Sequence, residues 1–523
     1  MTEAPDNFAR LSPFVEDMVM REKPTTILEI SARDTGYGER FALCQQRLGI
    51  SGGKIERLDL QLGDLDALGV YDFVFLPELE GMRGEEAREF LLKLQYHVTK
   101  QILAITPEYL PGQSATRREF HPLTFVGLDF SYWMFKSAEG NWQFYSFYKK
   151  HNLEAMPLDD MAGGEVETDR KMRIAFILPH RGVTGGLKAM LHQMRRLHQR
   201  GHTVKAYYSS DSCERVLPNW SELTDEDVSE QIVVPYSVKY LDAIKDVDVI
   251  FLCWMRLIPQ FAGASVPVVL WEQGYEYLFG DYGELKDSSF GFRQEMVDLY
   301  RLPVHILAVS PVISEILLAK YNRKTQLFPP GVDTDFYYPW KKNDELPPVM
   351  IVGHPGLDFK GFDFAFKVLR NAWDKGARFI VWWAYQVEPE RQETPFPINY
   401  YYMLTQTSMA LLYRFAHVFM STSLYEAFSL PPLEAMSAGT AVLATDNGGI
   451  RAYAVPGENC LLCEQGDIDG MTERLITLLA EPELRRKLAA AGRNTALAFS
   501  ADRVTDGLEK TLSSIAFGGL SWN

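Results

Sequence analysis

The sequence has 523 residues, of which 46% are hydrophobic and 23% are charged, and this composition is ordinary for a soluble globular protein. Its formal net charge of −16 disfavours nucleic acid as a partner and gives no general attraction to anionic lipids. No apolar run is long enough to span a bilayer, and the N-terminus lacks a basic-then-apolar signal pattern. The length favours about three domains.

The first part of the chain, residues 1–165, is predicted to form an α/β domain. Its first strand is expected at 26–30 and leads into the polar loop 31–38. Later strands are expected at 71–80 and 100–107. This order is similar to that of class I S-adenosylmethionine-dependent methyltransferases, in which a strand leads into a glycine-rich loop.

The loop after the first strand departs from that family's pattern. Only Gly36 and Gly38 stand there, and the side chains at 31–33 would obstruct close approach of the backbone to a cofactor. The resemblance therefore implies a degenerate, non-catalytic domain. Its aromatic end, residues 130–148, is expected either to form the core of a hairpin or to bind a partner, and a homo-oligomer through this domain is a further expectation.

A polar stretch at 158–170 is rich in Gly, Asp and Glu and is expected to be a linker. Beyond it, strand and helix signals alternate over 173–328 and again over 349–508. Such alternation predicts parallel sheets with helices on both faces. Ligands bind such folds beyond the carboxyl ends of the strands, and two facing domains would form a cleft.

One predicted helix, at 187–200, is basic within this acidic protein. We interpret its charges as a solvated helix face, and weak contact with a membrane or an acidic acceptor is the alternative. The five cysteines, an odd number in a long chain, favour reduced thiols and a cytoplasmic location. Cys460 and Cys463 form a single CxxC pair, which is interpreted as two small hydrophobic residues of a strand and not as a zinc site.

Two glutamates, Glu426 and Glu434, frame the predicted start of another helix. Pro431 and the proline after it fit only its first turn, where no backbone N–H bond is lost. Ser429 is expected to cap the helix N-terminus, and Gly439 is expected to follow its end in a left-handed conformation.

This arrangement suggests a ligand. A helix N-terminus offers unpaired N–H groups and a partial positive charge, which suit a phosphate or diphosphate. Glu426 could accept hydrogen bonds from one polyol, and Glu434 could accept them from a second one such as ribose. A phosphate flanked by two hydroxyl-rich groups describes a nucleotide sugar. The alternative is that both glutamates are surface residues that only stabilise the helix dipole.

The segment resembles the Glu-x7-Glu motif of the retaining GT-B glycosyltransferases, in particular the family 4 enzymes, which include sucrose-synthase-like and mannosyltransferase-like proteins. Further motifs match this family in the same order along the chain. They are the strand and Gly-Gly loop at 172–204, the linker at 328–336, the strand and Lys-Gly turn at 351–361, and the Gly-Gly to Leu-Leu segment at 445–462. The resemblance implies a GT-B fold whose Rossmann-like domains span 171–335 and 336–523, preceded by the α/β domain at 1–165.

The resemblance also implies roles for single residues. Glu426 and Lys360 are the expected catalytic residues: the glutamate holds sugar hydroxyls, and the lysine neutralises phosphate charge as the nucleotide diphosphate leaves. Glu434 is expected to bind the ribose. The other residues expected at the donor site are Gly185, Gly186, His354, Phe428, Ser429 and Leu430.

Several of these positions have a second interpretation. His354 stands where the family usually has an arginine, and it is expected either to contact the ligand or to make local hydrogen bonds. Gly185 and Gly186 would let the backbone approach the donor or the acceptor, or they form only a flexible turn. Lys360 could be a surface lysine beside a helix. Ser429 replaces a family glycine.

On the acceptor side, many family members place a histidine after the middle strand of the first Rossmann-like domain. Glu272, Gln273 and Glu276 occupy that region here and are expected to shape the cleft or help an acceptor. An ordinary polar loop at a strand end is the alternative.

Transferases of this type are thought to use front-face displacement, which needs neither a protein nucleophile nor a metal. Asp333 and Asp335 have the spacing of a metal motif but lie in the linker. The expected donor is a nucleotide-diphosphate sugar, with no further cofactor, and the acceptor is a glycan, a lipid-linked glycan, a protein or a small molecule. The alternatives are a bifunctional methyltransferase and glycosyltransferase, and a non-catalytic scaffold that binds sugar nucleotides.

Overall fold

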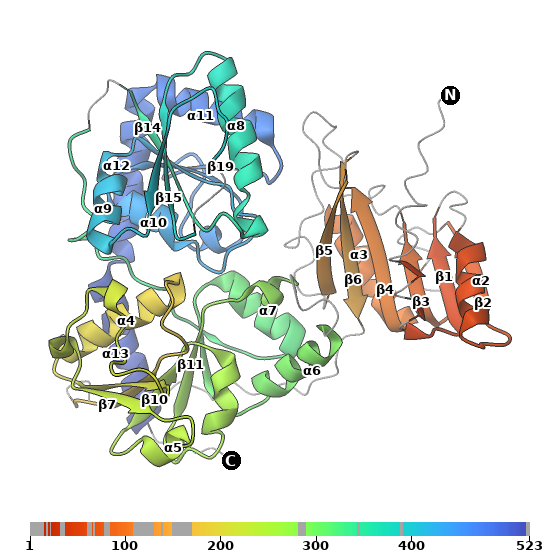
Figure 1. Ribbon diagram of the computed structural model, residues 1–523, viewed down its shortest axis with the longest axis horizontal. Coiled ribbons are helices and arrows are strands. Elements are labelled where there is room, and N and C mark those ends of the chain that lie inside the picture. The colour runs from red at the N-terminus through yellow and green to blue at the C-terminus, as the bar shows by residue number, and fades with distance from the viewer. Residues whose placement is uncertain are drawn as a thin grey trace. The chain divides into compact units, whose positions relative to one another are not determined.

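The protein is described by a computed structural model that covers residues 15–16, 19–20, 22–31, 37–59, 65, 68–77, 84–107, 130–137, 140–148, 170–280, 289–342, 346–387 and 391–518. The described strands form three sheets (Figure 1). The chain divides into two compact units. One comprises Met1–Glu154 and Glu276–Arg293, and the other comprises Ala155–Tyr275 and Gln294–Asn523.

The first sheet belongs to the N-terminal part of the chain. Its elements are β1 (Thr26–Ile30), α2 (Tyr37–Arg47), β2 (Lys54–Leu58), β3 (Tyr71–Leu76), α3 (Gly84–Leu94), β4 (Val98–Pro107), β5 (Phe130–Ser137) and β6 (Gly140–Tyr148). The strand order is β2-β1-β3-β4-β6-β5. β1 to β4 run parallel, and β5 and β6 form an antiparallel hairpin beside β4.

Helices cover both faces of this first sheet. Alternate residues of β3 point into two separate hydrophobic clusters because successive side chains of a strand face opposite sides. Phe73 and Phe75 pack against Phe41 of α2, whereas Val74 packs in the cluster of Phe90 from α3. The predicted α/β class of this domain is confirmed. The expected glycine loop lies mostly at 32–36 and the expected linker mostly at 158–169, and both fall outside the described residues. The side chains of the aromatic hairpin at 130–148 also fall outside them.

The second sheet is entirely parallel, in the order β13-β12-β11-β10-β7-β8-β9. Its elements are β7 (Arg173–Ile177), α4 (Gly185–Gln199), β8 (Thr203–Ser209), β9 (Glu230–Val234), α5 (Tyr240–Ala243), β10 (Val249–Leu252), β11 (Val268–Glu272), α6 (Ser289–Tyr300), β12 (His305–Ala308), α7 (Pro311–Tyr321) and β13 (Gln326–Leu327). The strand order reverses between β7 and β10. Such a reversal is where doubly wound sheets bind their ligands.

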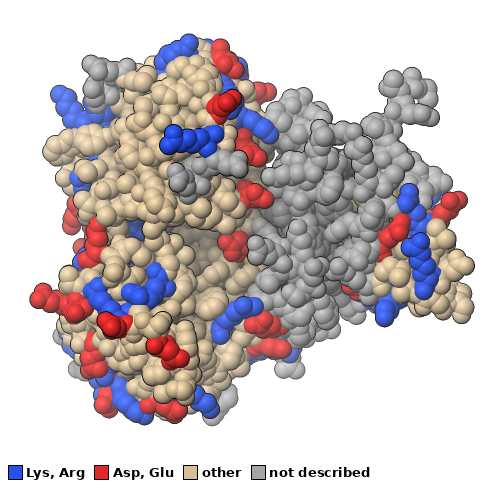
Figure 2. All heavy atoms as spheres, in the orientation of Figure 1, with Lys and Arg blue, Asp and Glu red and all other residues tan. Residues whose placement is uncertain are grey.

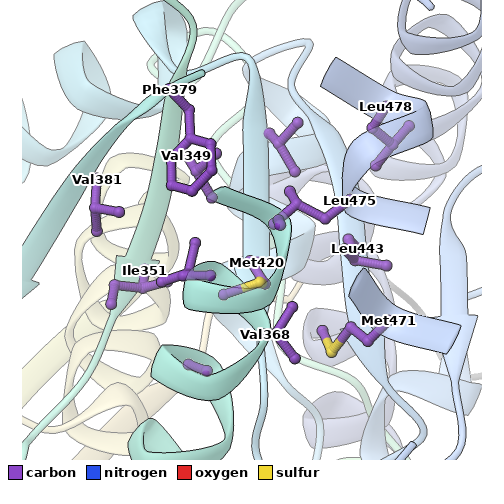
Figure 3. Close-up of a cluster of buried hydrophobic side chains, with 14 of the residues drawn as sticks. Val349, Ile351, Val368, Phe379, Val381, Met420, Leu443, Met471, Leu475 and Leu478 are labelled. Carbon is purple, nitrogen blue, oxygen red and sulfur yellow. The ribbon is translucent and has the colours of Figure 1, made fainter. Parts of the chain in front are cut away.

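The third sheet repeats this plan in the order β16-β15-β14-β17-β18-β19, again with parallel strands. Its elements are β14 (Pro348–Val352), α8 (Phe362–Asp374), β15 (Ile380–Tyr385), β16 (Ile398–Tyr402), α9 (Gln406–Phe415), β17 (Val418–Ser421), α10 (Leu430–Ser437), β18 (Ala441–Thr445), β19 (Leu461–Cys463), α11 (Ile468–Ala480) and α12 (Pro482–Ala498). Figure 3 shows the core of this sheet, where Val349 and Ile351 of β14 lie in one hydrophobic cluster with Leu475 of α11.

The last helix, α13 (Ala501–Phe517), follows the third sheet in sequence but packs on α4 and β10 of the second sheet. Ion pairs fasten it there. Arg200 lies 2.7 Å from Asp506 and 3.0 Å from Glu509. The neutral ring of His202 accepts at Nδ1 from the backbone N–H of Met172, 3.0 Å away, so its Nε2–H donates to Glu509 at 2.8 Å.

The core of the third sheet supplies a stability prediction. Leu475 is completely buried, and Leu475→Ala is expected to cost about 2–5 kcal/mol because it removes packing and leaves a cavity. Thermal unfolding would show this as a lower transition temperature. Leu497→Ala on α12 is the control, because Leu497 is 42% exposed. Equal unfolding temperatures for the two variants would contradict the packing described above.

Candidate functional site

The helix α10 starts where the sequence predicts, after the loop that follows β17. Its first turn contains Pro431 and Pro432, and Gly439 lies just beyond its end with a φ of 70°, so these three predictions are confirmed. Ser429 precedes the helix, but its side chain makes no capping hydrogen bond. That part of the prediction is wrong.

Ser429 has a left-handed backbone, with φ 66° and ψ 60°. This conformation costs a residue with a side chain about 1–2 kcal/mol. Neighbouring groups hold it in place: the Asn447 amide donates to Ser429 Oγ at 3.2 Å, and the Tyr453 hydroxyl donates to its carbonyl. The serine therefore fills a position that suits glycine, and its strain is located at the start of the predicted donor helix.

The structure brings Glu426 and Lys360 together. Lys360 Nζ lies 2.7 Å from Glu426 Oε1, and Ser423 Oγ donates to the same oxygen at 2.8 Å. The lysine and glutamate side chains are 20% and 18% exposed. Both side chains of this pair are therefore partly accessible to a ligand.

A close backbone contact positions Lys360. Gly361, which follows it, has a φ of 68°, and a Cβ there would lie 2.2 Å from the Thr422 carbonyl oxygen. Only glycine fits both demands. The Thr422 hydroxyl donates to the Lys360 carbonyl at 3.0 Å. The turn after β14 is thereby seated on the loop after β17, which carries Glu426.

His354 makes a local contact. Its Nδ1 accepts from the backbone N–H of Gly356 at 3.0 Å, so its proton lies on Nε2. This geometry agrees with the local hydrogen-bonding interpretation for one ring nitrogen. Phe428 is buried, and its ring centroid lies 5.3 Å from that of Tyr453. Leu430 is the first residue of α10.

Glu434 has a partner that the sequence did not indicate. Lys188 Nζ of α4 lies 2.5 Å from Glu434 Oε1 and donates to the Tyr337 hydroxyl at 3.0 Å. The glutamate side chain is only 7% exposed. Nothing in the spacing of these residues predicts the contact, because Lys188 and Glu434 are 246 residues apart.

The glycine loop before α4 is held by Gln273. Gln273 Nε2 donates to the Gly186 carbonyl at 3.0 Å, and a Cβ on Gly186 would lie 2.9 Å from Gln273 Oε1. Around Gly185, by contrast, a Cβ would meet nothing within 4 Å. Thr184 caps the helix by accepting from the N–H of Leu187 at 3.3 Å. Two of the predicted residues, Gly186 and Gln273, thus lie in direct contact.

Glu272 is a buried residue, 1% exposed at the end of β11. It accepts from the Tyr300 hydroxyl at 2.7 Å and from the N–H of Gly274 at 2.9 Å. Burial raises the pKa of this carboxyl, and those hydrogen bonds oppose the rise only in part. The described contacts give Glu272 a role in fixing its loop. Glu276 begins the short 3-10 helix Glu276–Phe279, in the compact unit that contains the first sheet.

The second and third sheets both belong to the larger compact unit, and loops from these two sheets contact each other at these residues. Gly274, with a φ of 74°, approaches so closely that a Cβ on it would lie 2.5 Å from the Cβ of Ala427. Ala427 directly follows Glu426. The loop after β11 therefore touches both the glycine loop before α4 and the loop that bears the Lys360 and Glu426 pair.

The basic helix α4 is paired along its length. Besides Lys188, its partners are Gln406 for His192, Asp227 for Arg195, Asp333 and Asp502 for Arg196, and Ser229 for His198. On the described part of the face drawn in Figure 2, Lys and Arg side chains are interspersed with Asp and Glu. The basic residues of α4 thus have partners within the protein itself. Contact of this helix with a membrane or an acidic acceptor stays a prediction.

No group of three or more His, Cys, Asp or Glu side chains in the described ranges is placed to hold a metal ion. None of the described helices is both long and apolar enough to cross a membrane. The cysteines of the described ranges are all free thiols, and burial raises the pKa of Cys460 to about 12.

Residues 398–495 match the family model described as "Glycosyl transferases group 1". The "Putative glycosyltransferase EpsD" of Bacillus subtilis is 39% identical over 95 residues, which is 18% of this chain and 25% of that protein. The "MMP alpha-(1->4)-mannosyltransferase" of Mycolicibacterium hassiacum is 38% identical over 95 residues, 18% of this chain and 23% of that protein. The chain thus spans about a quarter of the length of these two curated relatives.

Solved structures resemble a larger part of the chain. The sucrose-phosphate synthase of Thermosynechococcus elongatus gives a TM-score of 0.54 at 16% identity and covers 65% of this chain and 98% of that one. Anabaena HepE in complex with UDP and glucose gives 0.54 at 15% identity, over 66% of this chain and all of that one (100%). These likenesses concern the fold. Together with the two parallel sheets they confirm the predicted GT-B class.

The buried carboxyl of Glu272 supplies a pH prediction. Its pKa in the folded protein lies above its pKa in the unfolded chain, so stability is lost as the pH rises from the unfolded pKa through the folded pKa. Glu272→Gln keeps an acceptor and removes the charge. We expect its unfolding temperature to equal or exceed that of wild type at neutral pH, and the difference to shrink as the pH falls toward about 4.3.

Two controls accompany this measurement. Glu272→Ala leaves the Tyr300 hydroxyl and the Gly274 N–H without their acceptor and is expected to lower the unfolding temperature. Glu295→Gln changes a carboxylate whose side chain is 45% exposed and is expected to have little effect. A clear loss of stability for Glu272→Gln at neutral pH would show that the carboxylate, and not the neutral acid, suits this site.

Proposed function

We propose that this protein is a retaining glycosyltransferase, which moves a sugar from a nucleotide-diphosphate sugar to an acceptor hydroxyl. The observation that carries the proposal is the Lys360 and Glu426 ion pair at 2.7 Å, beside the N-terminus of α10. Glu426 lies in the segment that matches the group 1 glycosyl transferases. The GT-B fold supports the same assignment.

Each part of this site has a chemical task. The N–H groups of Ser429 and Leu430 at the start of α10 offer donors and partial positive charge to the diphosphate. Lys360 adds a full positive charge for the leaving nucleotide diphosphate. Glu426, already fixed by Lys360 and Ser423, accepts hydrogen bonds from the sugar hydroxyls.

The proposed reaction retains the configuration of the sugar. The bond between the anomeric carbon and the leaving phosphate oxygen breaks, and a bond to the acceptor oxygen forms on the same face. The proton of the acceptor hydroxyl goes to a phosphate oxygen of the leaving group. The protein supplies no nucleophile in this scheme. Its contribution is the positioning of the reactants and the stabilisation of charge that develops on the phosphate.

Replacement of either paired residue tests the assignment. Lys360→Ala and Glu426→Ala are each expected to lower kcat by about 100-fold or more, because each removes a charge that acts in the transition state. Initial-rate measurements with the best donor would show this. Lys367→Ala and Glu458→Ala alter exposed side chains and serve as controls. If both site variants matched an active wild type, the site assignment would fail. A wild type that neither transfers nor hydrolyses any donor sugar would instead favour a non-catalytic scaffold.

The donor can be narrowed by ligand-induced stabilisation. A ligand that binds only the folded state raises the unfolding temperature. We expect at least one nucleoside diphosphate among UDP, GDP and ADP to do so, with UDP favoured because HepE is solved with UDP and glucose. A thermal-shift screen measures this directly. No shift with any nucleoside diphosphate or nucleotide sugar would count against a donor site.

We infer that the N-terminal α/β domain, about residues 1–165, is a degenerate relative of the methyltransferases that no longer methylates. Its parallel strands with helices on both faces support the relationship. The sequence of its first loop supports the loss of activity. The proposal also includes two Rossmann-like domains, at 171–335 and 336–523. It further includes a cytoplasmic location and a homo-oligomer formed through the first domain.

A further inference from the structure

Lys188 joins three elements that are distant in the sequence. It projects from α4 of the second sheet and contacts Tyr337, between β13 and β14, and Glu434 on α10 of the third sheet. Its ammonium group also lies 5.4 Å from the centre of the Tyr337 ring. A single side chain thus connects one Rossmann-like domain to the carboxylate that we assign to the donor ribose.

This contact is enclosed by other side chains. Tyr337 is completely buried, and the side chains of Lys188 and Glu434 are 18% and 7% exposed. Burial disfavours the charge of the lysine, but the Glu434 carboxylate and the Tyr337 hydroxyl outweigh that effect and raise the pKa of Lys188. Burial, followed by the neighbouring Glu434 charge, raises the pKa of Tyr337. The lysine is therefore charged and the tyrosine neutral at physiological pH.

Such a contact restricts the carboxylate. A charge-assisted hydrogen bond is short and directional, so the hold of Lys188 on Oε1 limits the rotation of the Glu434 side chain. A carboxylate has about four lone-pair sites, so Glu434 can accept from a ligand hydroxyl in addition to Lys188 and the neighbouring Tyr337 and Tyr413 hydroxyls. A carboxylate that is fixed before the ligand arrives loses less entropy when it binds a hydroxyl.

We propose that Lys188 is a positioning residue for the nucleotide ribose: it holds the Glu434 carboxylate so that this carboxylate accepts the ribose 2′-hydroxyl. This inference rests on the proposed function, because it takes Glu434 as a donor-site residue. It adds that the ribose site is completed by a helix of the other Rossmann-like domain. Recognition of the ribose is then coupled to the contact between α4 and α10.

The contact between Lys188 and Glu434 could instead oppose nucleotide binding, and that role predicts a different outcome. If the ion pair merely closed the site against the nucleotide, the ligand would have to break it, and removal of Lys188 would tighten binding. If Lys188 positions Glu434, its removal weakens the binding of ribonucleotides and spares the binding of 2′-deoxyribonucleotides. The ratio of the two affinities therefore separates positioning from closure, and also from a purely structural effect.

The experiment is calorimetric titration of the full chain with UDP, GDP and ADP, each paired with its 2′-deoxy form. Wild type is expected to prefer the ribonucleotide by about 10-fold or more, the value of a hydrogen bond to a charged group. Lys188→Met is expected to reduce that preference to about 3-fold or less. Tyr337→Phe, which removes one acceptor of the lysine, is expected to give an intermediate ratio. Lys367→Met, an exposed lysine on α8, should retain the wild-type ratio.

Several results would overturn the proposal. One is a folded Lys188→Met protein that keeps the wild-type ratio, and another is tighter binding of both nucleotides. If Lys188→Met does not fold, Tyr337→Phe decides, and a wild-type ratio in that variant overturns the proposal. A wild type that binds a ribonucleotide and its 2′-deoxy form equally also overturns it. A wild type that binds no nucleoside diphosphate would instead remove the donor site itself.

Discussion

The guanidinium group of Arg493 fixes the chain where it passes from the second sheet to the third. It donates to the carbonyl oxygens of Tyr337 at 2.8 Å, Ser437 at 2.7 Å and Thr334 at 3.0 Å. Buried carbonyl groups need partners, and the planar fork of an arginine can serve several at once. This placement of the segment between β13 and β14 puts the Tyr337 hydroxyl within reach of Lys188. The polar contacts of α10 therefore depend on a residue outside the donor site.

The elements of the fold could be predicted because their signals are local. Buried parallel strands give short apolar runs, and the prolines of α10 are tolerated only in a first helical turn. The same holds for Gly361, whose place beside Lys360 in the sequence indicates a turn that needs glycine. The pairing of Lys360 with Glu426 was implied only by their shared roles. The distance between them comes from the structure.

Other features depend on contacts that a single sequence does not contain. Ser429 has the right residue type for a cap, but Asn447 engages its hydroxyl and its backbone turns left-handed. Glu272 has the sequence context of a polar residue at a strand end, yet it is buried and accepts a hydrogen bond from the Tyr300 hydroxyl. Lys188 looks like one more charge on a basic helix. In each case a distant partner decides the outcome.

Charge and burial explain the basic helix within an acidic protein. Acidic residues of α13, among them Asp502, Asp506 and Glu509, face the arginines of α4. The positive charge of one helix is thus matched by the negative charge of another from the far end of the chain. The net charge of −16 describes the chain as a whole and does not reveal this internal pairing.

The position of α13 has a consequence for synthesis of the protein. The domain built on the second sheet begins near residue 173, but the helix that covers its α4 and β10 ends at Phe517. A ribosome makes about 5–20 residues per second, so this domain waits tens of seconds for its last layer. During that interval the surface of α4 and β10 that α13 later covers lacks this helix. The domain built on the second sheet is therefore completed only after the third sheet has been synthesised.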